Sequence, residues 1–204
     1  MSAPLRQVAV LCVARQSIYR SLPGVDCYDD SRDVRTFGGN SPIVAHPPCR
    51  SWSNNLRHQA IVPPGEAELG LLCASWLRAC GGILEHPAHS HLFEAARLPK
   101  PGQEADGLWT LAVLQSWWGD PRAKKTWLCF SGIHPALVRV PCPRRKPLDV
   151  AHHWWRMSRR QRSATPPLMA SWLVRLARLS VPPGDLPASH PSPAGLGLKF
   201  QVPL

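Results

Sequence analysis

Short apolar runs, each ending in a turn or a proline, predict a series of β-strands early in the chain. Residues 7–13 tend toward an apolar strand, 25–29 form a second run that ends in acids, and 43–45 form a third. Pro47 and Pro48 follow the third run and forbid both helix and ladder pairing there. The interval between the first two runs has room for only a very short helix.

Helical spacing of apolar residues is clearest in two segments. Residues 66–80 begin after a Pro-Pro-Gly run, carry acids in their first turn, and end before paired glycines. Residues 168–179 follow two prolines that suit the first turn of a helix. Both segments are therefore predicted to be α-helices.

The segments between these helices alternate strand and loop signals. Residues 83–87 indicate a short strand that carries an acid and an imidazole to its carboxyl end, and 127–130 indicate a further strand. Residues 98–106, rich in proline, predict a surface loop. Residues 108–118 fit either a helix or a strand beginning at Val113. This alternation predicts an α/β fold with a mostly parallel central sheet and helices on both faces.

Composition narrows the class of protein. The 204 residues are expected to form one domain over 1–180, followed by a tail, 181–204, in which Pro, Ser and Gly dominate. The formal net charge of +11 favours a nucleic-acid partner, or serves solubility alone. Seven cysteines without a repeating spacing indicate free thiols in a reducing, cytoplasmic compartment. No apolar stretch is long enough to cross a membrane, so no membrane partner is expected.

Cys49 is the first candidate for chemistry. It follows two prolines on a stiff loop just past a strand, and open α/β sheets bind ligands at that position. Arg50, Ser51 and Ser53 come directly after it. A thiol in this basic setting is a candidate nucleophile with a lowered pKa. The alternative is a buried small apolar side chain, as most free cysteines are.

Other polar groups gather at later strand ends. Glu85 and His86 end the strand over 83–87. His86 also lies near His89 and His91, which raises a metal site, although their spacing matches no usual ligand pattern. The basic loop 119–126 suits phosphate contacts or forms an ordinary solvated surface.

Two further stretches are basic. Arg144 and Arg145 lie between prolines and must be exposed. Residues 154–162 interleave tryptophans with arginines, a composition expected of a groove that follows a nucleic-acid strand.

Taken in order, these motifs resemble the DNA cytosine-5 methyltransferase family over roughly residues 8–179. The Pro-Pro-Cys stretch resembles the nucleophile loop of that family, and residues 84–87 resemble its strand that ends in Glu-Asn. Residues 119–126 resemble its Gly-x-Pro-Gln-x-Arg-x-Arg motif. Residues 165–170 resemble its last motif, a Pro-Pro pair at the start of a helix. The chain is similar in style to small phage-encoded relatives of that family. The resemblance implies a compact, Rossmann-like fold of the methyltransferase type.

The resemblance also implies a reaction on a DNA base. Cys49 would add as a thiolate to C6 of a flipped pyrimidine and so activate C5 for group transfer. Glu85 would stabilise the ring near N3, and Lys124 would help to hold the adduct and the backbone. The residues expected to contact DNA are Arg50, Ser51, Ser53, His86, Arg122, Lys125, Arg144 and Arg145.

The cofactor of that family is S-adenosylmethionine, and Asp26, Asp29 and Pro48 lie near the positions that would hold it. The family's glycine loop is replaced by 14–18, which contain no glycine, and 132–162 is too short for a full target-recognition domain. We therefore expect no metal, a shortened S-adenosylmethionine site or another group donor, and a partner protein that supplies target recognition. The alternative functions are a catalytically inactive, methyltransferase-like DNA-binding protein and a metal enzyme built on the three histidines.

Overall fold

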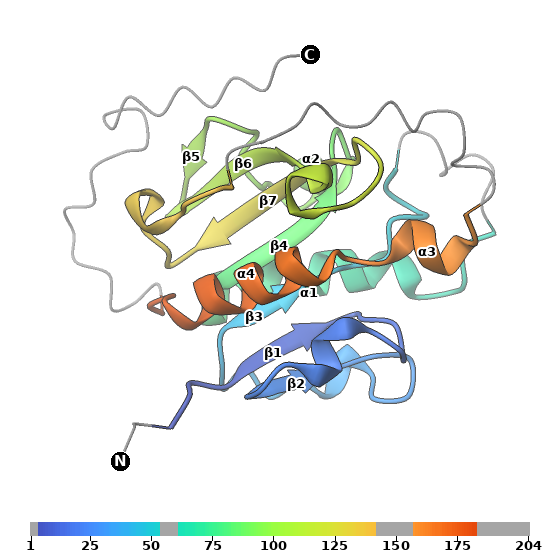
Figure 1. Cartoon of the computed structure of the whole chain (residues 1–204), viewed down its shortest axis with the longest axis horizontal. Helices are drawn as coiled ribbons and strands as arrows, with labels where there is room; N and C mark the ends of the chain where they lie inside the picture. Colours follow the sequence, from blue (N-terminus) through green and yellow to red (C-terminus); the bar gives the residue numbers. More distant parts are fainter. Residues whose placement is uncertain (1–3, 54–60, 142–156, 183–204) are drawn as a thin grey trace.

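The computed structural model describes residues 4–53, 61–141 and 157–182, which form a mixed sheet with helices against it (Figure 1). The seven strands of this sheet lie in the order β2-β1-β3-β4-β7-β6-β5. Their bounds are β1 Val8–Leu11, β2 Val25–Cys27, β3 Ile43–Ala45, β4 Gly82–Pro87, β5 Glu104–Ala105, β6 Leu108–Leu114 and β7 Lys125–Ser131. Residues 183–204 of the predicted tail lie outside the described residues.

The two helices predicted from apolar spacing are present. α1 spans Glu66–Cys80 and α4 spans Pro167–Arg178, within one residue of the predicted bounds. Gly65 and Gly81 flank α1 with φ of 75° and 73°, a left-handed conformation that glycine adopts without a Cβ penalty. The shorter elements are α2 Leu92–Ala95, α3 Arg159–Ser163 and the 3-10 turns η1 Ile18–Ser21, η2 Val34–Thr36, η3 Gln115–Trp118 and η4 Pro135–Leu137. Among the described residues, no helix combines the length and the apolar content that spanning a membrane requires.

Only half of the sheet is parallel, which corrects the expectation of a mostly parallel sheet. β2, β1, β3 and β4 pair in parallel, whereas β4 with β7, β7 with β6, and β6 with β5 pair antiparallel. A parallel connection needs a crossover of a dozen or more residues. The connection 115–124 between β6 and β7 is shorter than that, so the two strands pair as antiparallel neighbours.

The central strands are buried on both faces, and alternate residues contribute to two separate cores. Val8 and Val10 belong to the core that α4 covers, whereas Leu11 and Ile43 belong to the core that α1 covers. α4 lies in front of the sheet in Figure 1 and α1 behind it. The prediction of helices on both faces is confirmed, and burial on both faces explains why these strands are continuously apolar.

Residues 108–118 form a strand followed by a turn, not a helix. β6 begins at Leu108 rather than at Val113, and it pairs with β7 along its whole length. A short apolar run of this kind cannot be assigned to helix or strand by periodicity alone. The predicted loop 98–106 also contributes the two-residue edge strand β5.

Candidate active site

The strand order creates a crevice at the carboxyl ends of β1 and β3. From β1 the chain moves to β2 on one side and later returns to β3 on the other side of β1. The loops that leave β1 and β3 therefore diverge, and open α/β sheets bind ligands at such points. Residues 12–19 and 46–50 follow these two strands, and both segments line one cavity.

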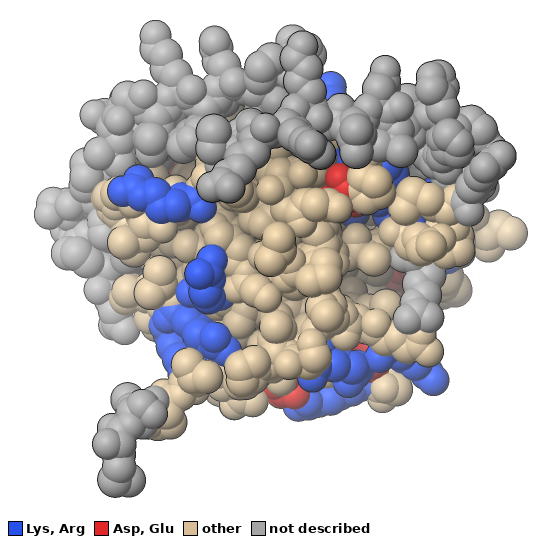
Figure 2. All heavy atoms as spheres, viewed as in Figure 1, with Lys and Arg blue, Asp and Glu red and all other residues tan. Residues whose placement is uncertain are grey.

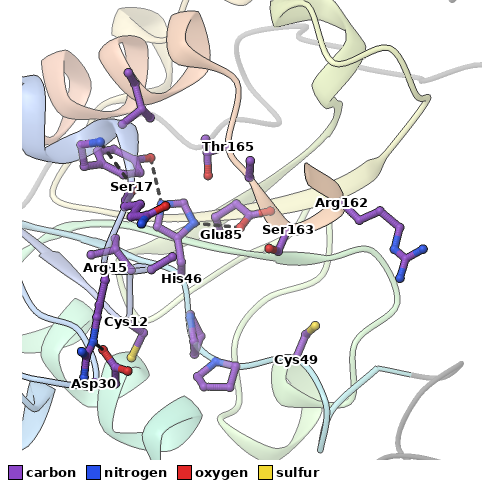
Figure 3. Close-up of a pocket in the computed structure, with 18 of the residues that line it drawn as sticks. Cys12, Arg15, Ser17, Asp30, His46, Cys49, Glu85, Arg162, Ser163 and Thr165 are labelled. Carbon is purple, nitrogen blue, oxygen red and sulfur yellow. Dashed lines mark hydrogen bonds and ion pairs between the residues drawn. The ribbon is translucent and has the colours of Figure 1, made fainter. Parts of the chain in front are cut away.

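This cavity has a volume of about 1410 Å³. Sites for one small molecule usually measure roughly 300–1,000 Å³, so this cavity exceeds the volume that one small molecule needs. Its remaining walls include Asp30 and Ile61, the end of β4, the residue before β7, the end of α3 and the segment that leads from α3 into α4 (Figure 3). Of the residues singled out from the sequence, those that line the cavity are Pro48, Cys49, Arg50, Glu85 and Lys124.

Cys49 lies at the bend of the loop that follows β3. Its carbonyl oxygen accepts hydrogen bonds from the backbone N–H groups of Trp52 (3.1 Å) and Ser53 (2.8 Å), which close a turn after the two prolines. The side chain is partly buried in the cavity wall (Figure 3). Burial raises the pKa of the Cys49 thiol, the charge of Glu85 raises it further, and the charge of Lys124 lowers it in part.

Arg50 is engaged elsewhere, which corrects the expectation that it lowers the pKa of Cys49. Its guanidinium forms a two-pronged ion pair with Glu66, at the start of α1, with Nε 2.9 Å from Oε1. The pair ties the Cys49 loop to α1 and neutralises the arginine charge. Because the thiolate is the reactive form of cysteine, a reaction that used Cys49 as a nucleophile would have to include release of its proton.

Glu85 is the buried acid of the cavity, 8% exposed. Oε2 lies 2.9 Å from Nδ1 of His46, and Oε1 accepts a 3.0 Å hydrogen bond from Nε2 of Gln115. Burial by itself raises the pKa of this carboxyl group. The hydrogen bond from His46 and the positive charge of Lys124 outweigh that effect and lower the pKa to about 2. Glu85 is therefore a carboxylate at any physiological pH.

Lys124 lines the same cavity and immediately precedes β7. Its positive charge acts on both Cys49 and Glu85, lowering the pKa of each. The three residues that the resemblance assigns to catalysis thus meet at one cavity, although they come from three distant parts of the sequence.

His86 points away from this cavity, which does not agree with its predicted contact with DNA. Neighbouring residues of a strand face opposite sides of a sheet, so His86 faces the side opposite to Glu85. Its side chain is fully buried, 0% exposed, and neither ring nitrogen has a hydrogen bond of normal geometry within the described residues. Burial lowers the pKa of His86 to about 4, while the charge of Glu85 and the nearby Pro48 carbonyl raise it in part.

The two acids expected to hold a cofactor are occupied by local partners and do not line the cavity. Asp26 forms an ion pair with Arg32. Asp29 accepts hydrogen bonds from the backbone N–H (2.8 Å) and hydroxyl (2.6 Å) of Ser31 and is paired with Arg20. The hydroxyl of Ser31 makes the largest contribution to the pKa of Asp29, which is lowered to about 2.

The loop after β1 likewise differs from a glycine loop. Cys12, the first residue after the strand, has φ of 60°, a left-handed conformation in which glycine would be unstrained. Arg15 lines the cavity here and its Nε lies 2.7 Å from Oδ1 of Asp30. The residues predicted to hold S-adenosylmethionine therefore do not come together at the cavity, and we derive no step through that cofactor.

Arg122, a predicted DNA contact, stabilises the loop between β6 and β7. Its guanidinium pairs with both carboxylate oxygens of Asp120, at 3.0 and 2.9 Å, and donates a 3.0 Å hydrogen bond to the carbonyl of Arg162. This arrangement links the loop to α3. Arg162 itself lines the cavity (Figure 3); it belongs to the stretch 154–162 that the sequence predicts to follow a nucleic-acid strand, and it was not among the predicted site residues.

The remaining predicted DNA contacts are dispersed. Lys125 is exposed at the start of β7. Ser51 and Ser53 are partly buried in the turn after Cys49, and the Ser51 hydroxyl has no hydrogen-bond partner within the described residues. Arg144 and Arg145 lie outside the described residues.

Sequence reasoning missed the groups that surround Glu85. Nε2 of His46 lies 2.9 Å from the Tyr19 hydroxyl, and Gln115 also donates a 3.0 Å hydrogen bond to Oγ1 of Thr126. A signal existed for His46, because it stands at the end of a predicted strand. Tyr19 and Gln115 carry no such signal, since only the strand order brings them to Glu85.

The histidine cluster gives no metal centre in the part of the chain that is described. Within those residues, no group of three or more His, Cys, Asp or Glu side chains is arranged to hold a metal ion. The ring of His89 instead lies against Trp127, with centroids 5.0 Å apart.

Comparisons with protein-family models, with curated proteins and with solved structures found no match to this chain. Any function must therefore be argued from the cavity itself.

Proposed function

We propose that this protein modifies a pyrimidine base of DNA through Cys49, in a Rossmann-like domain of the methyltransferase type. The observation that carries the proposal is the meeting of Cys49, Glu85 and Lys124 at one cavity. A thiol can add as a thiolate to a pyrimidine ring, a carboxylate can orient the ring through its N–H groups, and an ammonium group can balance the charge that develops on it. The position of the cavity, at the divergence of two parallel strands, supports the domain type.

The reaction begins when the Cys49 thiol releases its proton to solvent. The thiolate forms a bond to C6, and the electron pair of the C5–C6 double bond moves to C5. Glu85 accepts a hydrogen bond from an N–H group of the base, and Lys124 balances the negative charge that spreads over the ring. C5 then forms a bond to an electrophilic one-carbon donor, whose leaving group departs with its electron pair. A water molecule takes the C5 proton, and the electron pair of that C–H bond re-forms the C5–C6 double bond while the Cys49 thiolate leaves C6 with the electron pair of the C–S bond.

Charge supports DNA as the carrier of the base. The chain has 24 Lys and Arg against 13 Asp and Glu. On the face seen in Figure 2, basic side chains cover more of the described surface than acidic ones. A base must leave the duplex stack to reach such a cavity, which costs a few kcal/mol, and phosphate contacts offset part of that cost.

The test needs no donor, because addition of Cys49 to C6 makes C5 exchange its hydrogen with water. Protein and a cytosine- or uracil-containing oligonucleotide are incubated in deuterium oxide, and deuterium at C5 is measured by mass spectrometry of the nucleosides. We expect exchange with the wild-type protein and none with Cys49→Ser. Cys27→Ala is the matched control, because Cys27 is a buried thiol of β2 outside the cavity lining.

A Cys49→Ser protein that exchanges as fast as wild type overturns the mechanism. Salt-dependent DNA binding without exchange on any base favours the inactive DNA-binding relative instead. That alternative has one observation in its favour, namely that the residues predicted for the cofactor are not assembled at the cavity.

The group that is transferred is identified by a second experiment. Nucleosides from DNA co-expressed with the protein are analysed by mass, with DNA co-expressed with Cys49→Ser as the reference. The mass added to cytosine or uracil gives the group and thereby the class of donor.

A further inference from the structure

A continuous row of hydrogen bonds passes through Glu85 at the cavity wall. It runs from the Tyr19 hydroxyl to His46 (2.9 Å), from His46 to Glu85 (2.9 Å), and from Glu85 through Gln115 to Thr126 (3.0 Å each). Figure 3 shows the His46 ring beside Glu85, within the pocket lining. Gln115 and Thr126 are fully buried behind the cavity, so the row has a rigid end in the protein interior.

The positions of the protons in this row follow from its members. Glu85 is ionised and can only accept, so Nδ1 of His46 must carry a hydrogen and donate it. In the neutral ring Nε2 then accepts from the Tyr19 hydroxyl. Burial and the charge of Glu85 raise the pKa of Tyr19 well above its usual range, so that hydroxyl keeps its proton. The ionised Glu85 therefore fixes Nδ1 of His46 as a hydrogen-bond donor, and the Tyr19 hydroxyl pairs with the opposite ring nitrogen.

We propose that His46 is a positioning residue that fixes the Glu85 carboxylate as a hydrogen-bond acceptor for the pyrimidine. The proposal rests on the proposed function, in which Glu85 meets the base. His46 engages Oε2 and Gln115 engages Oε1, so the carboxylate cannot rotate. Each oxygen keeps a further lone pair for the substrate.

This arrangement specifies the edge of the base that is bound. A fixed carboxylate accepts hydrogen bonds and donates none, so the base must present N–H groups to it. Cytosine offers its exocyclic amine and uracil offers N3–H. By fixing Glu85, His46 sets the orientation of the pyrimidine ring. That orientation in turn decides whether Cys49 can approach C6.

Two substitutions at His46 separate its two hydrogen bonds. In His46→Asn the side-chain amide nitrogen takes the place of Nδ1 and retains the bond to Glu85. In His46→Gln the amide takes the place of Nε2 and retains only the contact with Tyr19. Tyr19→Phe is the matched control, because it removes the second contact and leaves the first.

We expect C5 exchange in His46→Asn and Tyr19→Phe to stay within a few-fold of wild type. In His46→Gln it should fall by roughly 10²-fold, the scale of loss when a reacting group is misplaced by about 1 Å. Equal loss in His46→Asn and His46→Gln, with unchanged thermal unfolding, overturns the positioning role, because the retained Glu85 contact should rescue the first.

A second readout does not depend on activity. The chain has five glutamates, so carboxyl ¹³C signals of labelled glutamate are resolvable, and Glu85→Gln assigns the one of interest. The Glu85 signal should stay that of a carboxylate down to about pH 3 in wild type and His46→Asn, and should titrate at higher pH in His46→Gln. The other titratable groups that act on Glu85 or respond to its charge are Lys124, His86, Cys49 and Tyr19, and they are unchanged in both variants.

The two readouts distinguish the two proposals. If the wild-type protein exchanges no C5 hydrogen, the proposed function fails, and the ¹³C titration alone decides whether His46 holds the carboxylate. If Glu85 titrates identically in wild type and His46→Gln, the inference about His46 is wrong whatever the activity.

Discussion

Replacing His86 with methionine should remove a pH dependence of stability that the wild-type protein shows between pH 7.5 and 4.5. His86 is fully buried in β4, opposite Trp127 in the register with β7, and its ring is held neutral. Methionine is unbranched and apolar and adapts to the space that the ring occupies. The substitution therefore removes the titrating group while keeping the core filled.

The sign and the size follow from the pKa of the ring. Burial lowers the pKa of His86 from 6.5 to about 4, so below pH 6.5 the unfolded chain binds a proton that the folded protein does not. Stability is therefore fully present above pH 6.5 and is lost as the pH falls toward 4. The difference between the two pKa values corresponds to a total loss of roughly 3 kcal/mol in the free energy of unfolding. About 2 to 3 kcal/mol of this loss occurs between pH 7.5 and pH 4.5.

The assay is guanidinium unfolding of both proteins at pH 7.5, 6.0 and 4.5, followed by tryptophan fluorescence. The wild-type free energy of unfolding should drop by about 2 to 3 kcal/mol more than that of His86→Met over this range. At pH 7.5 the variant should be as stable as wild type or more so by about 1 kcal/mol, since it removes two buried ring nitrogens that make no hydrogen bond of normal geometry to the described residues. Buried acids such as Asp29 are common to both proteins and cancel in the difference. Parallel pH profiles would refute the reasoning.

Three further outcomes are expected. Leu173→Ala, in the fully buried α4 core, should lower the free energy of unfolding in urea by about 2 to 5 kcal/mol. Gly82→Ala should prevent stable folding, because a Cβ there would lie 2.0 Å from a main-chain oxygen of β3. Gly102 also has a positive φ but lies in open space, so Gly102→Ala should lower the free energy of unfolding by only about 1 kcal/mol. Thermal unfolding of the two variants compares these outcomes. Lys124→Met should raise the pKa of the Cys49 thiol and slow its alkylation by iodoacetamide several-fold at pH 8. The alkylation rate is measured on the Cys49 peptide by mass spectrometry. An unchanged rate would mean that the lysine charge does not affect the thiol.

The local features of this protein were predictable because they depend on residues close together in the chain. Apolar spacing and flanking glycines or prolines define α1 and α4, whose bounds differ from the prediction by at most one residue. Two prolines after an apolar run place Cys49 on a loop at the end of β3. The alternation rule, applied to adjacent residues of β4, already separates Glu85 from His86, and the predicted site did not use this signal.

The partners of Glu85 and Arg50 were decided by tertiary structure. The short connection between β6 and β7 turned half of the sheet antiparallel, and the strand order brought His46 and Gln115 to Glu85. The charge beside Cys49 was likewise unpredictable, because Arg50 pairs with Glu66 at the start of α1. A pKa or a hydrogen bond depends on neighbours in space, and composition supplies only the candidates. By itself the sequence determined that a thiol stands at a strand end, whereas the fold determined that the thiol meets a carboxylate held by His46.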